Sequence, residues 1–151
     1  MPNRALLTTA LLAAGLAAVE PVATARADAV ADAVATMEAS VQDVRIAGGW
    51  EQDGRKGVFR VVIARSGLPQ TARLFVQWIA TGVDGSEALV RSVEIAEMEA
   101  LKLDIADFVT ESDPDGLSVF VEVIDPKADT DQSYELFLDH DGSYRFGPAS
   151  N

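Results

Sequence analysis

From residue 41 to the end of the chain, apolar residues recur at every second position in short segments. In 57–65, for example, the apolar residues Phe59, Val61 and Ile63 stand at alternate positions with charged residues around them. Such alternation is typical of a β-strand that buries one face. Seven segments show it: 57–65, 72–80, 88–96, 101–108, 117–124, 134–138 and 144–146. The pattern predicts seven or eight short strands.

Residues that favour tight turns separate these segments. They are Asp53-Gly54, 66–69 (Ser-Gly-Leu-Pro), 82–85 (Gly-Val-Asp-Gly), 113–116 (Asp-Pro-Asp-Gly) and Asp141-Gly142. Gly and Asp accept positive φ and Pro presets φ, so these sequences let a strand reverse direction. We therefore predict an all-β fold: an antiparallel immunoglobulin-like β-sandwich of seven to eight strands over residues 41–151.

The N-terminus has the composition of a secretory signal peptide. A basic start (Met1 to Arg4) precedes an apolar run of 15 residues from Ala5 to Val19, and small residues at A-x-A spacing end at Ala27. The run is shorter than the roughly 20 residues of a membrane-spanning helix. We predict a signal peptide over residues 1–27, export to the periplasm, and no membrane span after cleavage.

Residues 28–40 form an N-terminal lead-in with two possible structures. Val30, Val34, Met37 and Val41 are spaced by four, three and four, as on one face of a short helix. The alternative is a loosely ordered segment that a signal peptidase can reach.

The charge and the missing cysteines narrow the function. The chain of 151 residues has 24 acidic and 12 basic residues, a single His and no Cys, for a net charge of −12. Cleavage after Ala27 would leave 23 acidic and 10 basic residues, a charge of −13. Cysteine chemistry and disulfides are excluded, and the negative charge argues against nucleic acid as a partner. Stability must then come from packing.

Enzymatic residues are scarce. His140, the single imidazole, lies between two aspartates in a predicted turn, and Ser143 follows in the same turn. A catalytic His needs a nucleophile positioned by a rigid scaffold, and no G-x-S-x-G sequence is present. We predict a protein that is not an enzyme, with no catalytic residues and no cofactor; a hydrolase using His140 is the weaker hypothesis.

Acidic turns offer weak candidates for a metal site. Asp113 and Asp115 lie in the sequence Asp-Pro-Asp-Gly, and Asp139 and Asp141 lie in the sequence Asp-His-Asp-Gly. Residues 129–135 begin like an EF-hand loop but have Tyr134 where that loop needs Gly. Asp-Gly is also the ordinary sequence of a hairpin turn. We predict turns rather than a bound metal, and keep a calcium-dependent periplasmic or cell-surface binding module as the alternative function.

Apolar residues on the opposite side of the strands suggest a surface for a partner. If Leu74, Val76 and Trp78 point inward, Phe75 and Ile79 point outward. The same alternation turns Phe120, Ile124 and Phe137 outward. These five residues form an exposed patch unless a helix or loop covers them. We take as candidate partner-binding residues Arg73, Phe75, Gln77, Ile79 and Phe120.

The strand sequences carry a family resemblance. Residues 57–63 (Gly-Val-Phe-Arg-Val-Val-Ile), 74–79 (Leu-Phe-Val-Gln-Trp-Ile), 92–95 and 112–116 leading into 119–123 resemble the curli-assembly proteins of the CsgC/CsgH type. The likeness covers residues 44 to 138, in the order and spacing of strands. It implies an exported immunoglobulin-like domain that binds an amyloid-forming curlin subunit and inhibits its premature polymerisation, as a chaperone does.

Two departures limit what the resemblance implies. One branch of that family carries a Cys-x-Cys pair on the strand that here reads Ala72-Arg73-Leu74, so no redox role carries over. The strong negative charge is the second departure, because surface charge helps to select an aggregation-prone client. The resemblance implies contact through exposed strand edges and the Phe75/Ile79 face, which would block addition of strands to a growing cross-β edge.

Overall fold

The computed structural model describes residues 22–128 and 130–150. It divides into two units, one ending at Met37 and one beginning at Glu38, and each is described by itself. The elements, in chain order, are α1 (Val22–Ala35), β1 (Val41–Gln52), β2 (Arg55–Ser66), β3 (Thr71–Thr81), β4 (Glu87–Glu94), α2 (Ala96–Leu101), β5 (Asp104–Asp113), β6 (Gly116–Asp125), β7 (Thr130–Asp139) and β8 (Tyr144–Pro148).

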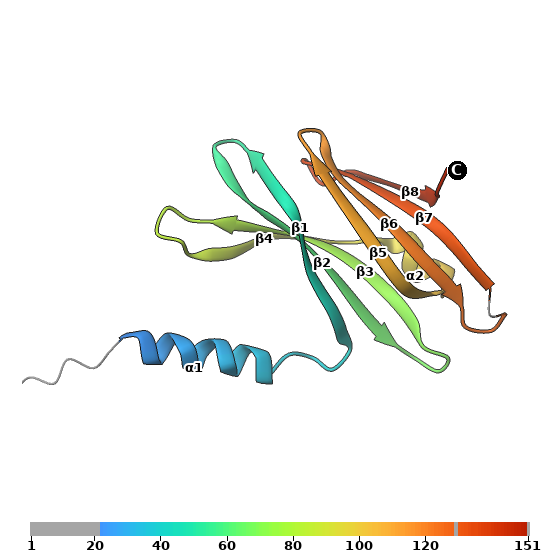
Figure 1. The fold of residues 1–151 in the computed structure, drawn as a ribbon, viewed down its shortest axis with the longest axis horizontal. Coiled ribbons are helices and arrows are strands. Elements are labelled where there is room, and N and C mark those ends of the chain that lie inside the picture. The colour runs from blue at the N-terminus through green and yellow to red at the C-terminus, as the bar shows by residue number, and fades with distance from the viewer. Residues whose placement is uncertain (1–21, 129, 151) are drawn as a thin grey trace, which may run out of the picture. The chain divides into compact units, whose positions relative to one another are not determined.

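The second unit contains two antiparallel four-stranded sheets (Figure 1). The first sheet has the order β1-β2-β3-β4 and the second has the order β5-β6-β7-β8, with α2 between them along the chain. This confirms the predicted all-β sandwich architecture. An immunoglobulin domain distributes its strands between sheets with Greek-key connections. Here each sheet consists of four consecutive strands, so the strand order does not itself support the immunoglobulin-like assignment.

The inner faces of the two sheets form one apolar core. Phe59 and Trp78 from the first sheet meet edge to face, with ring centroids 5.4 Å apart. Leu136 and Leu138 from the second sheet are fully buried in the same cluster. Burial of each such side chain contributes about 1.5–3 kcal/mol. Among the described residues no polar or charged residue is buried, so apolar packing holds the cysteine-free sandwich together.

Residues predicted to favour tight turns lie in the turns between strands. Asp53 and Gly54 connect β1 to β2 with φ of 52° and 72°, a combination that suits the right-handed twist of a tight hairpin. Gly85 and Gly142 have positive φ in the β3–β4 and β7–β8 turns. Local turn sequences therefore determine where these strands reverse.

Two strands differ from the prediction, β1 because a bulge interrupts the period of two and β5 because a helix precedes it. β1 was missed, since its register with β2 shifts between Ile46 and Gly49. The segment 101–108 was wrong at its start, because Leu101 ends α2 and β5 begins at Asp104. A further shift after Ile105 places both Ile105 and Phe108 on the buried side of β5.

The N-terminal unit contains α1, which confirms a helix in part of the lead-in. Val30, Val34 and Met37 are exposed, and Val41 belongs to β1 rather than to the helix. The predicted cleavage point after Ala27 falls within α1, while the apolar run 5–19 lies outside the described residues. None of the helices in 22–128 and 130–150 has the length and apolar character required to cross a membrane.

Candidate partner-binding face

The outer face of the first sheet, meaning the side turned away from the core, carries more apolar residues than a solvated sheet face needs. Directly paired residues of antiparallel strands share a face, so the register defines rows across the sheet. One row joins Val44, Val62, Phe75 and Glu94; another joins Gly49, Val58, Ile79 and Leu89. Two largely apolar rows thus cross all four strands.

A polar row lies between these two rows. Arg60 on β2 donates through Nε to Gln77 Oε1 at 2.8 Å, and Gln77 Nε2 donates to Ser92 Oγ at 3.3 Å. The register adds Ile46 at the β1 end of the row. The chain of side-chain hydrogen bonds spans three strands and fixes the orientation of the Gln77 amide at the centre of the face.

Arg73 lies at one end of this face, near the start of β3. Its guanidinium makes two hydrogen bonds to the Glu94 carboxylate, Nε–Oε1 at 2.6 Å and Nη2–Oε2 at 2.7 Å, and lies 5.1 Å from the Phe75 ring centroid. The hydrogen bond from Arg73 lowers the pKa of Glu94 below its ordinary value, against a smaller opposing effect of burial. The same hydrogen bond raises the pKa of Arg73. The pair stays charged and keeps the guanidinium over the ring.

The face combines exposed and partly buried side chains. Ile46 is 61% exposed, and Val44 and Leu89 are also exposed, whereas Phe75 is half-buried. Ile79 is only 6% exposed, which corrects the prediction that it is an exposed contact residue. It lies between its paired neighbours on β2 and β4, and the register shift after Trp78 places β4 residues beside it.

Phe120 does not belong to this face. It lies on β6, and with Ile124 and Phe137 it points out of the second sheet, on the opposite side of the sandwich. The predicted single patch of five outward residues is therefore wrong, because a sandwich has two outer faces. The structure brings together Arg73, Phe75, Gln77 and Ile79, and leaves Phe120 with a different surface.

The two outer faces differ in charge. On the first sheet, the bases Lys56, Arg60 and Arg73 are matched by the acids Glu51, Glu87 and Glu94. On the second sheet, Arg145 is accompanied by a larger number of acids, among them Asp107, Glu111, Glu122, Asp131 and Glu135. The outer face of the first sheet is therefore the one on which the charges balance.

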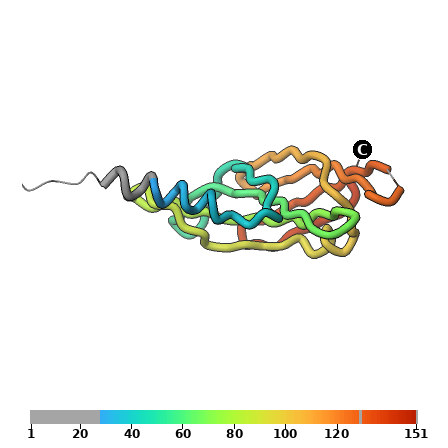
Figure 2. Tube along the Cα trace, turned by 90° about the horizontal axis from the view of Figure 1, so that it is seen from below, coloured from blue at the N-terminus to red at the C-terminus, as the bar shows by residue number. Residues whose placement is uncertain are grey.

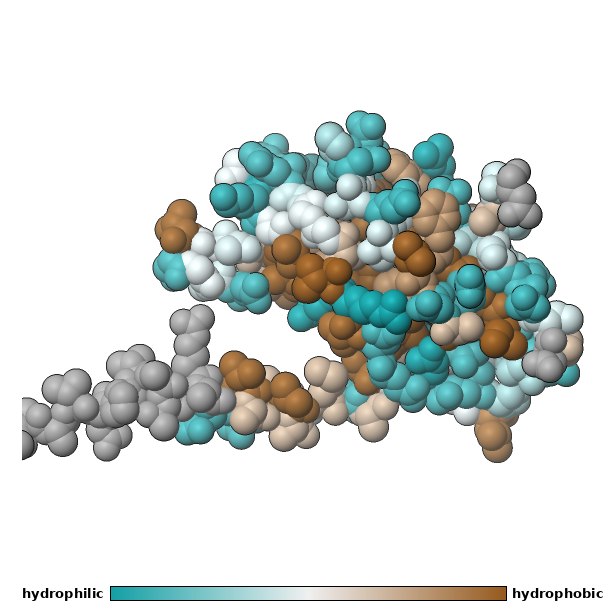
Figure 3. All heavy atoms as spheres, in the orientation of Figure 1, coloured by the Kyte–Doolittle hydropathy of each residue, from teal (hydrophilic) through white to brown (hydrophobic). Residues whose placement is uncertain are grey.

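Hydrophobic side chains gather where β1 and β5 are drawn in Figure 3, with hydrophilic side chains between them.

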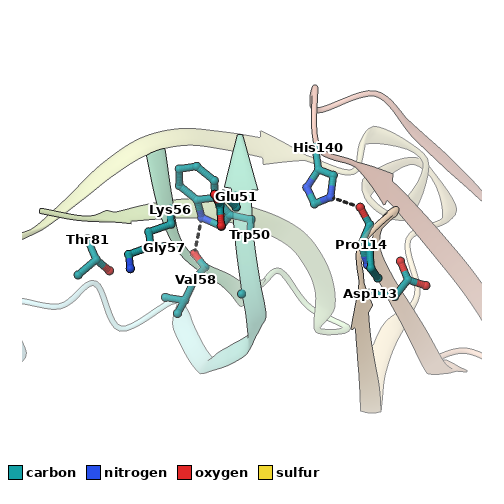
Figure 4. A pocket seen from close by; sticks show the side chains of 10 residues that line it. Trp50, Glu51, Lys56, Gly57, Val58, Thr81, Asp113, Pro114 and His140 are labelled. Carbon is teal, nitrogen blue, oxygen red and sulfur yellow. Dashed lines mark hydrogen bonds between the residues drawn. The ribbon is translucent and has the colours of Figure 1, made fainter. Parts of the chain in front are cut away.

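His140 is a packing residue, not a solvated turn residue. Its ring stacks on Phe59 at a centroid distance of 6.2 Å, and Nε2 lies 2.8 Å from the Pro114 carbonyl oxygen. In Figure 4 it stands beside a shallow, open depression of about 740 Å³ that Trp50 and Lys56 also line. Nδ1 is buried without a hydrogen-bond partner in the described part of the chain. Among the described residues, the imidazole has no hydrogen bond to a nucleophile or to an orienting carboxylate, as a catalytic base would need.

Three of the four acidic candidates for a metal site, Asp113, Asp139 and Asp141, cap turns, and the fourth, Asp115, donates its amide to Asp113. Asp113 Oδ1 accepts hydrogen bonds from the amides of Asp115 and Gly116 at 2.8 and 3.0 Å. Asp139 accepts from the His140 amide, and Asp141 accepts from the Ser143 amide, each at 2.8 Å. Hydrogen bonds from Ser143 lower the pKa of Asp141. Within the described ranges, no group of three or more His, Asp or Glu side chains is arranged to hold a metal ion.

The strands next to β3 supply the part of the face that the sequence did not reveal. Arg60 could have been found from the alternation of β2, since it is out of phase with Phe59. Ile46 gave no such signal, because bulges break the pattern of β1. Ser92 becomes relevant only through its pairing with Gln77.

Comparison with known proteins gives no assignment: no protein-family model, curated protein or solved structure matches the chain.

Proposed function

We propose that this protein is exported to the periplasm, has no enzymatic activity, and binds an amyloid-forming curlin subunit to inhibit its premature polymerisation. The outer face of the first sheet is its binding surface. The observation that carries the proposal is the pair of apolar rows through Phe75 and Ile79, separated by the hydrogen-bonded row Arg60–Gln77–Ser92.

The chemistry of this face suits a client rich in β-strands. Growing cross-β assemblies present flat arrays of apolar side chains and ladders of amide side chains. The face can contact both features. Val44, Ile46 and Leu89 are exposed apolar side chains, and the Gln77 amide is held between Arg60 and Ser92. Contact with an early assembly would cover the surface on which the next layer of strands packs.

The distribution of charge favours contact with a client at this face rather than at the acidic outer face of the second sheet. The exported chain would carry a charge of −13, and the outer face of the second sheet is strongly acidic. Bases and acids balance on the outer face of the first sheet, so apolar contact there is not opposed by a net field. Similarity to the curli-assembly family supports the same client class, although the consecutive strand order differs from an immunoglobulin domain.

The calcium-dependent alternative has little support. Asp113, Asp139 and Asp141 already accept backbone hydrogen bonds in their turns, and we do not propose a metal-dependent function.

The proposal is tested by polymerisation kinetics. The protein is expressed from its full-length gene, recovered from the periplasm and added at a substoichiometric amount to a purified curlin subunit in a dye-binding assay. We expect a longer lag time than for the subunit alone. An unchanged lag time would refute the proposed function.

A matched pair of variants locates the surface. Ile46 and Val109 are β-branched residues on the outer faces of β1 and β5, and they are 61% and 60% exposed. Ile46→Thr should shorten the lag extension, and Val109→Thr, which changes the other sheet, should leave it intact. Both substitutions are at solvated positions, so thermal melting of both variants should stay close to the wild type. Equal effects of the two variants would contradict the assignment of the face.

A further inference from the structure

We infer that β4 is the strand edge that receives the client, by pairing with an extended segment that presents an amide or hydroxyl side chain and an apolar side chain on the same face. This inference rests on the proposed function and names the part of the molecule that makes backbone contact. The sandwich has four edge strands, β1, β4, β5 and β8. They differ in whether their backbone groups are free.

The backbone of β4 offers hydrogen-bonding groups to a new strand. The Ile95 amide donates to the Leu74 carbonyl at 2.9 Å, so the neighbouring pair Phe75–Glu94 is not a hydrogen-bonded pair of the ladder. Antiparallel pairs alternate in this respect, and Gln77–Ser92 is of the same kind. The N–H and C=O groups of Ser92 and Glu94 therefore point away from β3. In the described part of the chain they have no hydrogen-bond partner.

Side chains cover the corresponding groups of β5. The amides of Ile105 and Phe108 each donate to the carboxylate of the preceding aspartate at 2.8 Å. The carbonyl of Phe108 accepts from Arg45 at 3.2 Å, and that of Ile105 accepts from Arg65 at 2.5 Å. Since these groups are already paired, β5 is closed to strand addition from its start to Phe108.

The two remaining edges are less suitable. β1 lies beside β5 (Figures 1 and 2), and a Cβ atom at its Gly48 would overlap the Ser112 side chain. A new strand along β1 would have to displace β5. β8 has five residues and ends at Pro148, which has no N–H to donate. β4 has eight residues, and six of them are exposed.

The side chains of β4 indicate the sequence of the partner strand. A residue opposite Ser92 would extend the row Arg60–Gln77–Ser92, which favours an amide or hydroxyl side chain. A residue opposite Leu89, which is exposed, should be apolar. The acidic character of the whole domain disfavours an acidic partner and a second copy of this chain. A strand of an amyloid-forming subunit that has an amide and an apolar side chain on one face meets these requirements.

A proline substitution tests the edge without removing a bond to β3. Ser92→Pro deletes an N–H that faces outward, a position where edge strands tolerate proline. It also removes the hydroxyl that Gln77 contacts, so Ser92→Ala is the matched control, because it loses the hydroxyl and keeps the N–H. We expect Ser92→Ala to shorten the extension of the curlin lag time in part, because the contact with Gln77 is lost, and Ser92→Pro to abolish the extension, because the backbone N–H is lost as well.

The outcomes separate the inference from the proposed function. If the wild type extends the lag and Ser92→Pro extends it as long as Ser92→Ala does, the β4 edge is refuted and the function stands. If the wild type has no effect, the function itself fails. If the wild type is a dimer in sedimentation and Ser92→Pro is a monomer, the occupant is a second copy, which also overturns the inference.

Hydrogen exchange of the unmodified protein gives a second readout that does not depend on how Ser92→Pro folds. Addition of monomeric curlin subunit should slow exchange of the Ser92 and Glu94 amides by at least about tenfold, which is about 1.4 kcal/mol. The Phe108 amide, already paired with Asp107, should not change. Unchanged exchange at both β4 amides would refute pairing at this edge.

Discussion

Arg73 on β3 and Glu94 on β4 are joined by two parallel hydrogen bonds of 2.6 and 2.7 Å at the rim of an apolar sheet face. The pair joins an inner strand to the edge strand and holds a cation over Phe75. The same ion pair therefore attaches β4 to β3 and positions a side chain of the candidate face. Both side chains remain partly exposed, which limits how much the pair contributes to folding.

Removal of this pair should produce a stability loss that depends on pH. Arg73 lowers the pKa of Glu94 from its ordinary 4.5, so the folded state favours the ionised carboxylate. The stabilisation is present above pH 4.5 and is lost as the pH falls through the lower pKa of the folded state. Glu94→Gln should therefore reduce the free energy of unfolding by at most about 1 kcal/mol at neutral pH. Urea denaturation at neutral and at acidic pH measures the difference.

The partner variant provides the control for this prediction. Arg73→Gln should give a similar loss, and the double variant should lose little more than either single one, because both substitutions remove the same interaction. A loss that persists unchanged in acid would contradict the role of the ion pair.

Gly57 should be required for the close approach of β2 to β3, the two central strands of the candidate face. A Cβ atom at Gly57 would overlap the carbonyl oxygen of Ile79, so Gly57→Ala must displace one of the two strands. We expect a destabilisation of about 1–3 kcal/mol and a shift of the Ile79 resonances. Gly147→Ala is the control, since nothing lies within 4 Å of the added atom. Equal denaturation midpoints for the two variants would show that the backbone contact is unimportant.

Arg65 should hold the two sheets together at one end. It extends from β2 in the first sheet to the Asp104 carboxylate at 2.7 Å and to the Ile105 carbonyl at 2.5 Å, both at the start of β5. Its side chain is only 17% exposed, and Arg65→Met keeps most of the stem while it deletes these bonds. We expect a loss of about 1.5–3 kcal/mol in denaturant unfolding.

An exposed arginine provides the comparison for Arg65. Arg145 lies 5.0 Å from the Phe137 ring centroid on the outer face of the second sheet, and Arg145→Met should cost no more than about 1 kcal/mol. If Arg65→Met costs as little as Arg145→Met, the bridge between the sheets does not contribute.

The sequence predicted most of the strands and their turns, because both depend on neighbours along the chain. Phe59, Val61 and Ile63 occupy the core as their alternation indicated, and Asp53-Gly54 forms the hairpin that its positive φ values require. The failures have a local cause too. A bulge in β1 breaks the alternation of that strand, and another in β5 shifts the phase of the pattern after Ile105.

By itself, then, the sequence determined an all-β chain, its cysteine-free apolar core and the outward direction of Phe75 and Gln77. The tertiary structure alone decided which outward residues share a surface. Phe120 and Phe75 have the same alternation signal, yet they lie on different sheets, and Arg60, Gln77 and Ser92 meet only through strand pairing. The physical reason is that alternation specifies the side of a strand, whereas the neighbours of that side are set by register, sheet order and packing between sheets.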